Sequence, residues 1–361
     1  DGEVLHQLIQ TARPYGWPAN NLFYQPLLET TLADGLARYP QVSVRRGREF
    51  TRFIQDADGV SVMHIESRGA QYSKQAPVLG QTPAPQEGEE VLRARYFVAC
   101  DGGRSAVRAQ LGINMTGKSF PNPWIVVDIR QKDGEDCLRH LPYFSFICDP
   151  ECPTVSCRQP YGHHRFEFML MPGQTKEHME KPETVRAYLS KYVDVSKVEV
   201  LRSLVYTFNA LVAEKWRDGR VFLAGDAAHM TPQFVGQGMN AGVRDAYNLA
   251  WKLDAVLKGQ AGDRLLDSYQ RERRPHAKAM IDLSIHMKNF VSTSNPLLGV
   301  LRNVATRTAR RTPGLREFLS EAKFKPRPRY EAGAYFGLPR QRRNGLEGEQ
   351  LPQPTLADRE C

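Results

Sequence analysis

An acidic residue and two glycines stand out in the stretch VFLAGDAAHMTPQFVGQGMN, residues 221–240. The run VFLAG is short and wholly apolar, which is typical of a strand buried on both faces. A carboxylate that follows such a strand, here Asp226, lies where open α/β sheets bind ligands. It can accept a hydrogen bond from a ribityl or ribose hydroxyl. Gly236 and Gly238 have no Cβ, so a flat or charged ligand can approach the backbone closely.

Helical periodicity begins near Met239, directly after these glycines. The N–H groups in the first turn of a helix have no acceptor within the helix, so they favour a ligand with partial negative charge. One side of this helix is predicted to be buried, along Met239, Val243, Ala246, Ala250 and Leu253. Taken alone, the pattern also fits an ordinary strand, turn and helix in which the glycines only make the turn.

The rest of the chain supplies the elements that must position these residues. In the first part, a helix is predicted within 21–39, from Pro26 onward. Strands are predicted at 42–47, 60–67 and 91–100, with a loop at 69–90 between the second and the third. A short helix is predicted within 101–113. The middle has successive strand-like runs at 123–130, 143–149, 154–160, 165–173 and 198–209, with one helical pattern at 181–193. This part predicts a mostly antiparallel sheet between two parts of an α/β unit. Residues 264–291 are predicted to continue helically with a kink or break at Pro275, and the basic tail from Arg316 shows no strong periodicity.

Composition limits the classes of function. The chain has 361 residues, of which 41% are hydrophobic, enough for one large domain or two ordinary ones. Its net charge of +9 is spread thinly, which indicates solvated basic faces or attraction of small anions rather than nucleic-acid binding. The six cysteines form no C-x-x-C pair, so we expect reduced thiols and no metal site. No apolar run reaches the roughly 18 residues of a membrane span, and no signal-peptide pattern opens the chain. We therefore expect a cytoplasmic protein that does not bind membranes.

Three segments together resemble one family. The string Gly225–His229, with Pro232 and the run Gly236–Asn240, resembles the second flavin fingerprint of the FAD-dependent aromatic-ring hydroxylases, the p-hydroxybenzoate hydroxylase-like family. CDGGRSAVR at 100–108 resembles the Asp-Gly motif that lies near both FAD and the nicotinamide cofactor in that family. FYQP at 23–26 resembles a segment whose glutamine touches the flavin. These matches occur in the family's order and span most of the chain.

The resemblance implies FAD as cofactor, NADH or NADPH as reductant, and a cytoplasmic hydroxylase of a phenolic aromatic acid in aromatic-compound catabolism. Oxygen would enter ortho to the hydroxyl through a C4a-hydroperoxyflavin. The expected partners are therefore a small phenol and O2. The assembly that the resemblance suggests is a homodimer. The implied cofactor-binding residues are Gln25, Asp101, Gly102, Arg104, Gly225, Asp226, Ala227, Pro232, Gly236, Gly238, Met239 and Asn240. Arg108 is a further candidate for contact with phosphates.

The resemblance also suggests residues for the chemistry. A base near the phenol would favour the more reactive phenolate. The candidates are the Pro232 carbonyl, His229, Arg165 for a substrate carboxylate and Tyr206 for the phenol, with His163, His164 and Asn209 as weaker ones. His229 is more readily explained as ordering the loop than as moving a proton, and core packing is an equal explanation for Tyr206.

The chain departs from the family in one respect, because no G-x-G-x-x-G opens a strand-to-helix turn. We therefore expect an α/β (α+β) fold: an incomplete Rossmann-like FAD-binding domain with an inserted, mostly antiparallel substrate sheet and a C-terminal helical segment. The expected boundaries are 1–118 and 216–258 for the FAD-binding domain, 119–215 for the sheet domain and 259–361 for the helical segment and tail. An N-terminal segment and a thioredoxin-like C-terminal region are expected to be missing. A related polyketide or antibiotic hydroxylase and a non-catalytic fragment unable to hold FAD stay open as alternatives.

Overall fold

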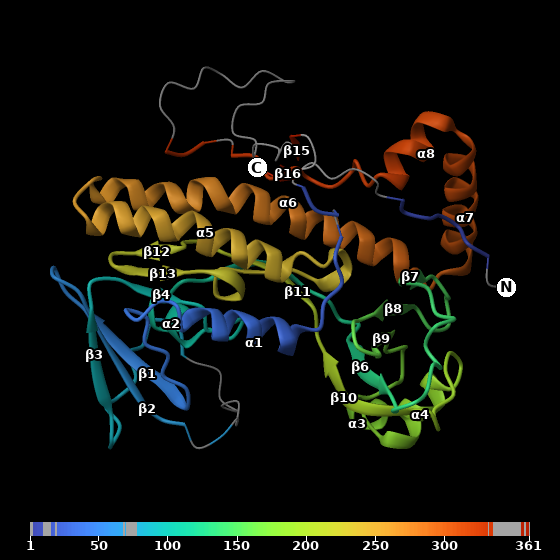
Figure 1. Cartoon of the computed structure of the whole chain (residues 1–361), viewed down its shortest axis with the longest axis horizontal. Coiled ribbons are helices and arrows are strands. Elements are labelled where there is room, and N and C mark those ends of the chain that lie inside the picture. The colour runs from blue at the N-terminus through green and yellow to red at the C-terminus, as the bar shows by residue number, and fades with distance from the viewer. Residues whose placement is uncertain are drawn as a thin grey trace.

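The computed structural model describes residues 3–9, 16–18, 20–67, 69, 78–330, 332–334, 355–356 and 359–360. Two long helices lie side by side across one end of the molecule and cover short strands, while two larger sheets extend below them (Figure 1). The long helices are α5 (Gly238–Leu257) and α6 (Ser268–Val291). The short connection between them contains the 3-10 helix η3 (Asp263–Asp267).

A small three-stranded sheet lies under α5 and α6. Its order is β12 (Arg217–Asp218), β13 (Val221–Leu223) and β4 (Phe97–Ala99). β13 and β4 run parallel with Leu223 opposite Ala99, and all three residues of β13 are buried. The apolar run before Asp226 is therefore the buried strand that the sequence predicts.

A second small sheet joins this layer to residues 225–240, the segment that resembles a flavin fingerprint and is called the flavin-like loop below. It comprises β14 (His229–Met230), β11 (Asn209–Ala213) and β5 (Met115–Ser119), in that order. The short helix α2 (Ala106–Gln110) precedes β5, and the 3-10 helices η1 (Gly225–Ala227) and η2 (Gln233–Val235) flank β14. Because η1 and η2 pack on α5 and α6 respectively, the loop is supported from the helical side.

The predicted antiparallel sheet in the middle of the chain is confirmed. Its five strands, in the order β10-β6-β9-β8-β7, are antiparallel to their neighbours. They are β6 (Trp124–Gln131), β7 (Phe144–Ile147), β8 (Thr154–Arg158), β9 (His163–Met169) and β10 (Val198–Tyr206). The helices α3 (Lys176–Met179) and α4 (Pro182–Leu189) belong to the same part of the chain. One face of the sheet forms its own apolar core with Met179 and Leu189, so the other face is left for the flavin-like loop.

The N-terminal part differs from the prediction in one strand. Helix α1 (Gln25–Leu36) forms as expected, but the predicted strand at 42–47 is wrong. The chain instead pairs β1 (Arg48–Gln55) with β2 (Val60–Glu66), and β2 with β3 (Glu90–Ala94). Val44 is 58% exposed whereas Phe53 of β1 is 5% exposed, so the later segment has the side chain that packing can bury. The predicted strand at 91–100 is also divided into β3 and β4.

The predicted buried side of α5 is wrong as well. Met239 and Val243 are exposed, as are Ala246 and Ala250, and Leu253 is only half-buried. The side that faces α6 has the spacing of a helical stripe, and its members are Ala241, Asp245, Asn248, Leu249 and Lys252. Three of the five are polar or charged and find partners on α6. Apolar periodicity therefore selected the wrong face.

The C-terminal part is helical where the structure describes it. α6 continues through Pro275, so the predicted break is wrong. Helices α7 (Pro296–Arg311) and α8 (Pro313–Ser320) follow, and β15 (Thr355–Leu356) pairs with β16 (Arg359–Glu360). The basic tail from Arg316, which shows no strong periodicity in the sequence, begins within α8, and more than half of it lies outside the described residues. None of the described helices is long and apolar enough to cross a membrane.

Candidate functional site

The parallel pairing of β4 and β13 brings two acidic motifs together. Asp101 follows β4 by two residues and Asp226 follows β13 by three. The backbone N–H of Ala224 donates to the carbonyl of Ala99 at 3.0 Å, which extends the pairing past the end of both strands. Because parallel strands end at the same edge of a sheet, both carboxylates leave the sheet on the side where α/β folds bind ligands.

Arg108 ties the two motifs to each other. Its guanidinium donates to the carbonyl of Ala227 at 2.9 Å and to that of Gly103 at 2.7 Å. Burial lowers the pKa of this guanidinium. The side chain is therefore a brace between the two turns, and its predicted phosphate contact is not the role that these hydrogen bonds give it.

The Asp-Gly motif is held by helix-capping contacts. Asp101 Oδ2 accepts from the N–H of Val107 at 3.1 Å, and Ser105 Oγ accepts from the N–H of Arg108 at 2.9 Å, which satisfies N–H groups at the start of α2. Gly102 has φ +79, a left-handed conformation that glycine adopts without strain. Arg104 is exposed, so it is the arginine of this motif that remains open to a ligand phosphate.

Asp226 is exposed but lies in a partly desolvated position beside the buried strand, and this desolvation raises the pKa of its carboxyl. Gly225, directly before it, has φ +58 and its Cα lies against Gly242 of α5. Among the described residues, none donates a hydrogen bond to the Asp226 carboxylate. Its oxygens are therefore available to accept from a ligand hydroxyl.

The first two turns of α5 lie next to the turn that carries Asp226, because η1 packs on α5 and Gly225 lies against Gly242. Gly236 has φ +61, and an added Cβ there would meet open space. Among the described residues, no side chain caps the start of the helix, and the side chain of Asn240 turns back to the carbonyl of Gly236 at 3.1 Å. The first-turn N–H groups at Gly238 and Met239 are thus left for a ligand with partial negative charge.

His229 is part of the interior. It is fully buried, and its Nε2 lies 2.6 Å from Asp245 Oδ2, while its ring packs on Trp216 at 5.0 Å between centroids. Its Nδ1 has no hydrogen-bond partner among the described residues. A side chain enclosed in this way cannot reach a substrate, so the geometry supports the ordering role and corrects the catalytic one.

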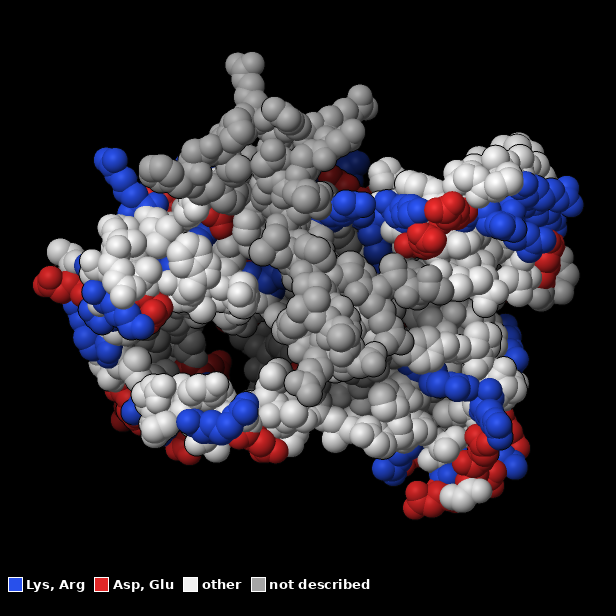
Figure 2. Space-filling model, turned by 45° about the horizontal axis from the view of Figure 1, so that its top comes forward, with Lys and Arg blue, Asp and Glu red and all other residues white. Residues whose placement is uncertain are grey.

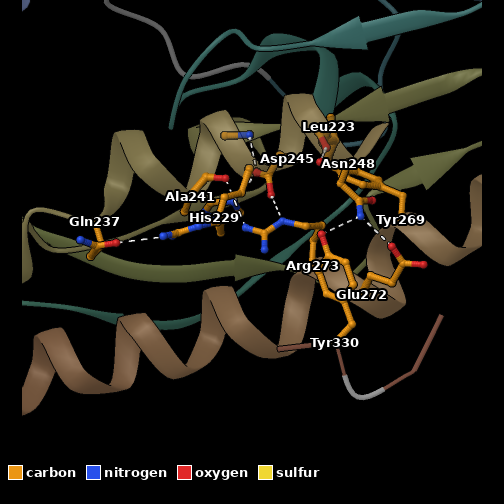
Figure 3. Close-up of polar contacts among 12 residues, drawn as sticks. Leu223, His229, Gln237, Ala241, Asp245, Asn248, Tyr269, Glu272, Arg273 and Tyr330 are labelled. Carbon is orange, nitrogen blue, oxygen red and sulfur yellow. Dashed lines mark hydrogen bonds and ion pairs between the residues drawn. The ribbon is translucent and has the colours of Figure 1, made fainter. Parts of the chain in front are cut away.

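Asp245 connects that histidine to the loop and to α6. Its carboxylate also accepts from the N–H of Gly225 at 3.1 Å and from Arg273 Nε at 2.9 Å. Figure 3 shows His229 and Arg273 directed at Asp245 between the helices. Asp245 and Arg273 are 0% and 1% exposed. One buried carboxylate therefore sets the position of the turn that carries Asp226.

A second buried ion pair lies further along the same helices. Lys252 Nζ lies 2.5 Å from Glu272 Oε2, and Asn248 Nδ2 donates to the same oxygen at 2.6 Å. The hydroxyl of Tyr269 donates to the carbonyl of Leu223 at 3.0 Å, which attaches α6 to the end of β13. Lys252, for which the sequence indicated no role, is thus a buried structural partner.

The Pro232 carbonyl carries one internal hydrogen bond. Ser284 Oγ of α6 donates to it at 2.5 Å, and Pro232 itself is buried. The next residue, Gln233, donates its side-chain Nε2 to Glu167 Oε2 of β9. Burial raises the pKa of the Glu167 carboxyl to about 7. The loop is therefore bonded to α6 on one side and to the five-stranded sheet on the other.

Arg165 lies on the same face of that sheet and is paired within the protein. Its Nε and Nη2 bond Asp128 at 2.6 and 3.1 Å. Arg202 bonds the same carboxylate, with Nη2 at 2.8 Å from Oδ2, and its Nη1 donates to the hydroxyl of Tyr206 at 3.3 Å. Two guanidinium groups share the Asp128 carboxylate, so these three side chains, called the arginine cluster below, together keep a net positive charge, which an ionised Glu167 on the same face would offset. Arg202 is the more exposed of the two arginines, at 46% against 27% for Arg165.

Four candidates remain, which are the implied flavin contact Gln25 and the weaker substrate candidates His163, His164 and Asn209. Gln25 begins α1 and donates to Glu29 at 2.7 Å. His163 stacks on Tyr24 with ring centroids 4.0 Å apart, which brings the FYQP segment to the sheet. His164 is fully buried on the opposite face, against Ser156 Oγ at 2.8 Å, so it takes no part in this site. Asn209 bonds Ser119 at 2.6 Å.

Sequence reasoning missed four polar residues that organise the region. Each is a charged side chain within an otherwise apolar or helical run, and they are Asp128, Glu167, Arg202 and Asp245. The runs IVVDIR and FEFML carried a usable signal, because a charged residue inside an apolar strand needs a partner. Two described surface pockets lie elsewhere, around Arg217 and around Tyr192.

The described surface in view has both signs of charge interspersed, without a single basic face (Figure 2). Among the described residues, no cluster of His, Cys, Asp and Glu could hold a metal ion. The groups at this sheet edge, the Asp226 carboxylate and the first-turn N–H groups of α5, are suited to binding a small molecule.

Known proteins with similar sequences agree with this geometry. Residues 6–284 match the family described as FAD binding domain. A relative from Escherichia coli O81 (strain ED1a), named 3-(3-hydroxy-phenyl)propionate/3-hydroxycinnamic acid hydroxylase, is 42% identical over 89% of this chain and 54% of its own. A protein of the same name from Klebsiella pneumoniae (strain 342) has the same identity and coverage. The chain spans about half the length of these curated relatives.

Solved structures support the same assignment. The flavin-dependent monooxygenase PieE, solved with FAD and substrate, has a TM-score of 0.70 over 93% of this chain and 62% of its own, at 23% identity, which bears on the fold alone. OxyS anhydrotetracycline hydroxylase from Streptomyces rimosus is 30% identical, with a TM-score of 0.60 over 80% of this chain and 54% of its own. The predicted fold class and the resemblance to FAD-dependent aromatic hydroxylases are confirmed. Because the family match extends over well more than half of the chain, this protein belongs to the FAD binding domain family.

Proposed function

We propose that the protein is an FAD-dependent monooxygenase that hydroxylates a phenolic aromatic acid ortho to its hydroxyl. The proposed substrate is 3-(3-hydroxyphenyl)propionate or a close analogue, and the reductant is NADH or NADPH. The observation that carries the proposal is the unpaired Asp226 carboxylate beside the open first turn of α5, in a chain 42% identical to relatives named for that substrate.

The residues present fit FAD. Asp226 has free acceptor capacity for a ribityl hydroxyl, and the first-turn N–H groups at Gly238 and Met239 favour the electron-rich edge of the flavin ring. Arg104 is exposed at the Asp-Gly turn and supplies positive charge for a phosphate. When bound, reduced FAD supplies the activation of O2, and the oxygen atom that reaches the ring comes from that O2. The protein holds the cofactor, orients the phenol and keeps water away from the reaction.

The arginine cluster supports an acid as the substrate. Arg165 and Arg202 share Asp128 and keep one positive charge on the sheet face that meets the flavin-like loop. A carboxylate that bonds the exposed side of Arg202 would balance that charge. Tyr206 lies next to it, with its hydroxyl bonded to Arg202, so it is assigned to the carboxylate end of the substrate rather than to the phenol.

Two titrations test the proposal. FAD binding, followed by quenching of flavin fluorescence, should weaken about 10–100-fold in Asp226→Asn, as expected for loss of a charged hydrogen bond. Asp254→Asn, which removes an exposed carboxylate of α5, is the matched control and should bind as the wild type does. Equal binding by Asp226→Asn would overturn the assignment of Asp226 to the cofactor.

Turnover tests the substrate. NADH or NADPH consumption with 3-(3-hydroxyphenyl)propionate should yield a dihydroxy product by mass spectrometry, whereas 3-phenylpropionate should yield none. Arg202→Met should raise KM for the acid about 10–100-fold and leave KM for the neutral phenol 3-ethylphenol unchanged. Turnover of a polycyclic polyketide in place of these phenols would favour the antibiotic-hydroxylase alternative.

A second candidate is a fragment that keeps the fold but does not hold FAD. It is favoured by the lack of a G-x-G-x-x-G turn in the sequence, since that turn commonly binds the pyrophosphate. A folded chain that gives no flavin quenching would support this candidate and exclude the enzyme.

A further inference from the structure

Glu167 is a buried carboxyl group that the proposed chemistry has not yet used. It is 6% exposed and lies on β9, between Val126 of β6 and Val155 of β8 in the sheet register. Alternate residues of a strand share a face, so Glu167 lies on the face of Arg165. This is the face that meets the flavin-like loop, because Gln233 of η2 bonds the Glu167 carboxyl directly.

Gln233 connects that carboxyl to the edge of the site. It follows Pro232, whose carbonyl is fixed by Ser284, and its side chain is half-buried. The side-chain amide has one donor end and one acceptor end. When one end bonds Glu167, the other is presented to whatever lies beyond the loop.

We propose that Glu167 and Gln233 form a proton-coupled switch that determines whether the loop offers an acceptor or a donor to a phenolic oxygen. The inference rests on the proposed function, because it assigns the group that receives the phenol proton. Glu167 acts through Gln233 and is therefore a positioning residue.

The two states follow from the hydrogen-bond inventory. An ionised Glu167 can only accept, so it bonds the Gln233 NH2 group and leaves the amide oxygen to accept from a phenol O–H. A protonated Glu167 can donate to the amide oxygen, so the amide turns over and its NH2 group donates to a phenolate. In passing from the first state to the second, the phenol O–H bond is lost and a carboxyl O–H bond forms on Glu167. The number of protons and the total charge are unchanged.

The surrounding charges allow both states. Electrostatic neighbours of Glu167 are Arg165 on its own strand, Asp128 on β6 and the Cys157 thiol on β8, while η2 contributes the neutral Gln233. Desolvation raises the pKa of the Glu167 carboxyl to about 7, against the opposing effects of Arg165 and Gln233. The carboxyl is therefore mostly protonated one pH unit below neutrality and mostly ionised one unit above.

The test uses a probe whose protonation is visible, 3-(3-hydroxy-4-nitrophenyl)propionate, since its phenolate is yellow and its phenol titrates near neutral pH. Phenolate absorbance of the protein-bound probe is recorded against pH. Two groups that share a proton titrate in two macroscopic steps, so the wild type should show two steps. Glu167→Gln removes the second titrating group, and Gln233→Leu removes the connection but leaves the Glu167 carboxyl in place. Both variants should show one step.

The matched control is Glu199→Gln, which changes an exposed carboxylate on β10 of the same sheet and should keep two steps. A single step in the wild type would overturn the inference, and so would two steps in Gln233→Leu, because the coupling would then be a field effect alone. Infrared spectra of the protein without probe give a second readout. The wild type should gain a carboxylic C=O band between pH 8 and pH 6 that Glu167→Gln lacks, and its absence in the wild type would also overturn the inference.

These outcomes separate the inference from the proposed function. A protein that hydroxylates the parent phenol, yet shows one step in both the wild type and Glu167→Gln, keeps the function and loses the switch. A protein that neither binds the probe nor hydroxylates the phenol loses both.

Discussion

The buried carboxylate of Asp245 gives the most direct test of how the loop is held. Its oxygens bond Arg273, His229 and the N–H of Gly225, and neither Asp245 nor Arg273 has more than 1% of its side chain exposed. Asp245→Asn keeps the shape but leaves the Arg273 charge without a counter-charge in the interior. Breaking one side of a buried ion pair costs about 3–5 kcal/mol, so we expect the free energy of unfolding to fall by about that amount.

A double variant separates the charge from the other contacts. In Asp245→Asn with Arg273→Met the uncompensated charge is gone, and the asparagine oxygen can still accept from Gly225 or His229. Replacing both partners of a buried pair is often close to neutral, so the double variant should regain most of the lost stability. The single variant Asp254→Asn, at an exposed pair with Lys258, should change stability by less than about 0.5 kcal/mol.

Urea unfolding followed by tryptophan fluorescence measures these differences, because Trp216 packs on His229. Equal m-values across the variants would allow the midpoints to be compared as stabilities. A loss below about 1 kcal/mol in Asp245→Asn, well under the range for a broken buried pair, would refute the reasoning. A double variant less stable than the single one would refute it too.

Three further predictions use features away from the loop. Burial lowers the pKa of His164 to about 4, so this histidine takes up a proton below about pH 6.5 in the unfolded chain but only near pH 4 in the folded chain. The free energy of unfolding should therefore fall as the pH drops from about 6.5 to about 4. In urea titrations at several pH values, His164→Gln should reduce this slope by up to about 1.4 kcal/mol per pH unit. A Cβ at Gly117, which has φ +141, would lie 2.0 Å from the carbonyl oxygen of Ala210, so Gly117→Ala should lower the free energy of unfolding by more than about 2 kcal/mol. The control Gly134→Ala, at φ +78 with open space around it, should lower it by only about 1–2 kcal/mol. Equal losses of stability in the two variants would show that the β5–β11 contact does not matter. Burial raises the pKa of Cys157 to about 12, so iodoacetamide at pH 8 should leave this thiol unmodified in the native protein and label it in urea. Peptide mass spectrometry measures the labelling. Labelling at the same rate in the native and the urea-unfolded protein would contradict the protection of this thiol by burial.

Much of the architecture could be predicted because its signals are local. Alternating or continuous apolar runs identified all five strands of the middle sheet, and the apolar run before Asp226 identified β13. The motif order indicated that the Asp101 and Asp226 turns serve one site. The structure places both turns at one edge of the sheet, because β4 and β13 run parallel.

The errors have a common physical cause. The face of α5 that packs on α6 is partly polar, because Asp245 and Lys252 are neutralised by Arg273 and Glu272. Pairing partners that are far apart in sequence cannot be seen from periodicity, so the more apolar face was predicted to be inside. The same limit applies to Arg165, whose partner Asp128 lies on a neighbouring strand, and to Glu167, whose partner Gln233 lies in a loop.

The two ion pairs between α5 and α6 also restrict how these helices can slide. Apolar side chains tolerate small displacements, since one methyl group can replace another. An exchange of partners here would place Arg273 against Lys252, or Glu272 against Asp245, and a buried like-charge contact is strongly unfavourable. A single alignment of the two helices therefore survives, and the hydroxyl of Tyr269 transmits it to the end of β13. The point at which the chain turns toward Asp226 is thus selected by charge order and not by the close fit of side-chain shapes.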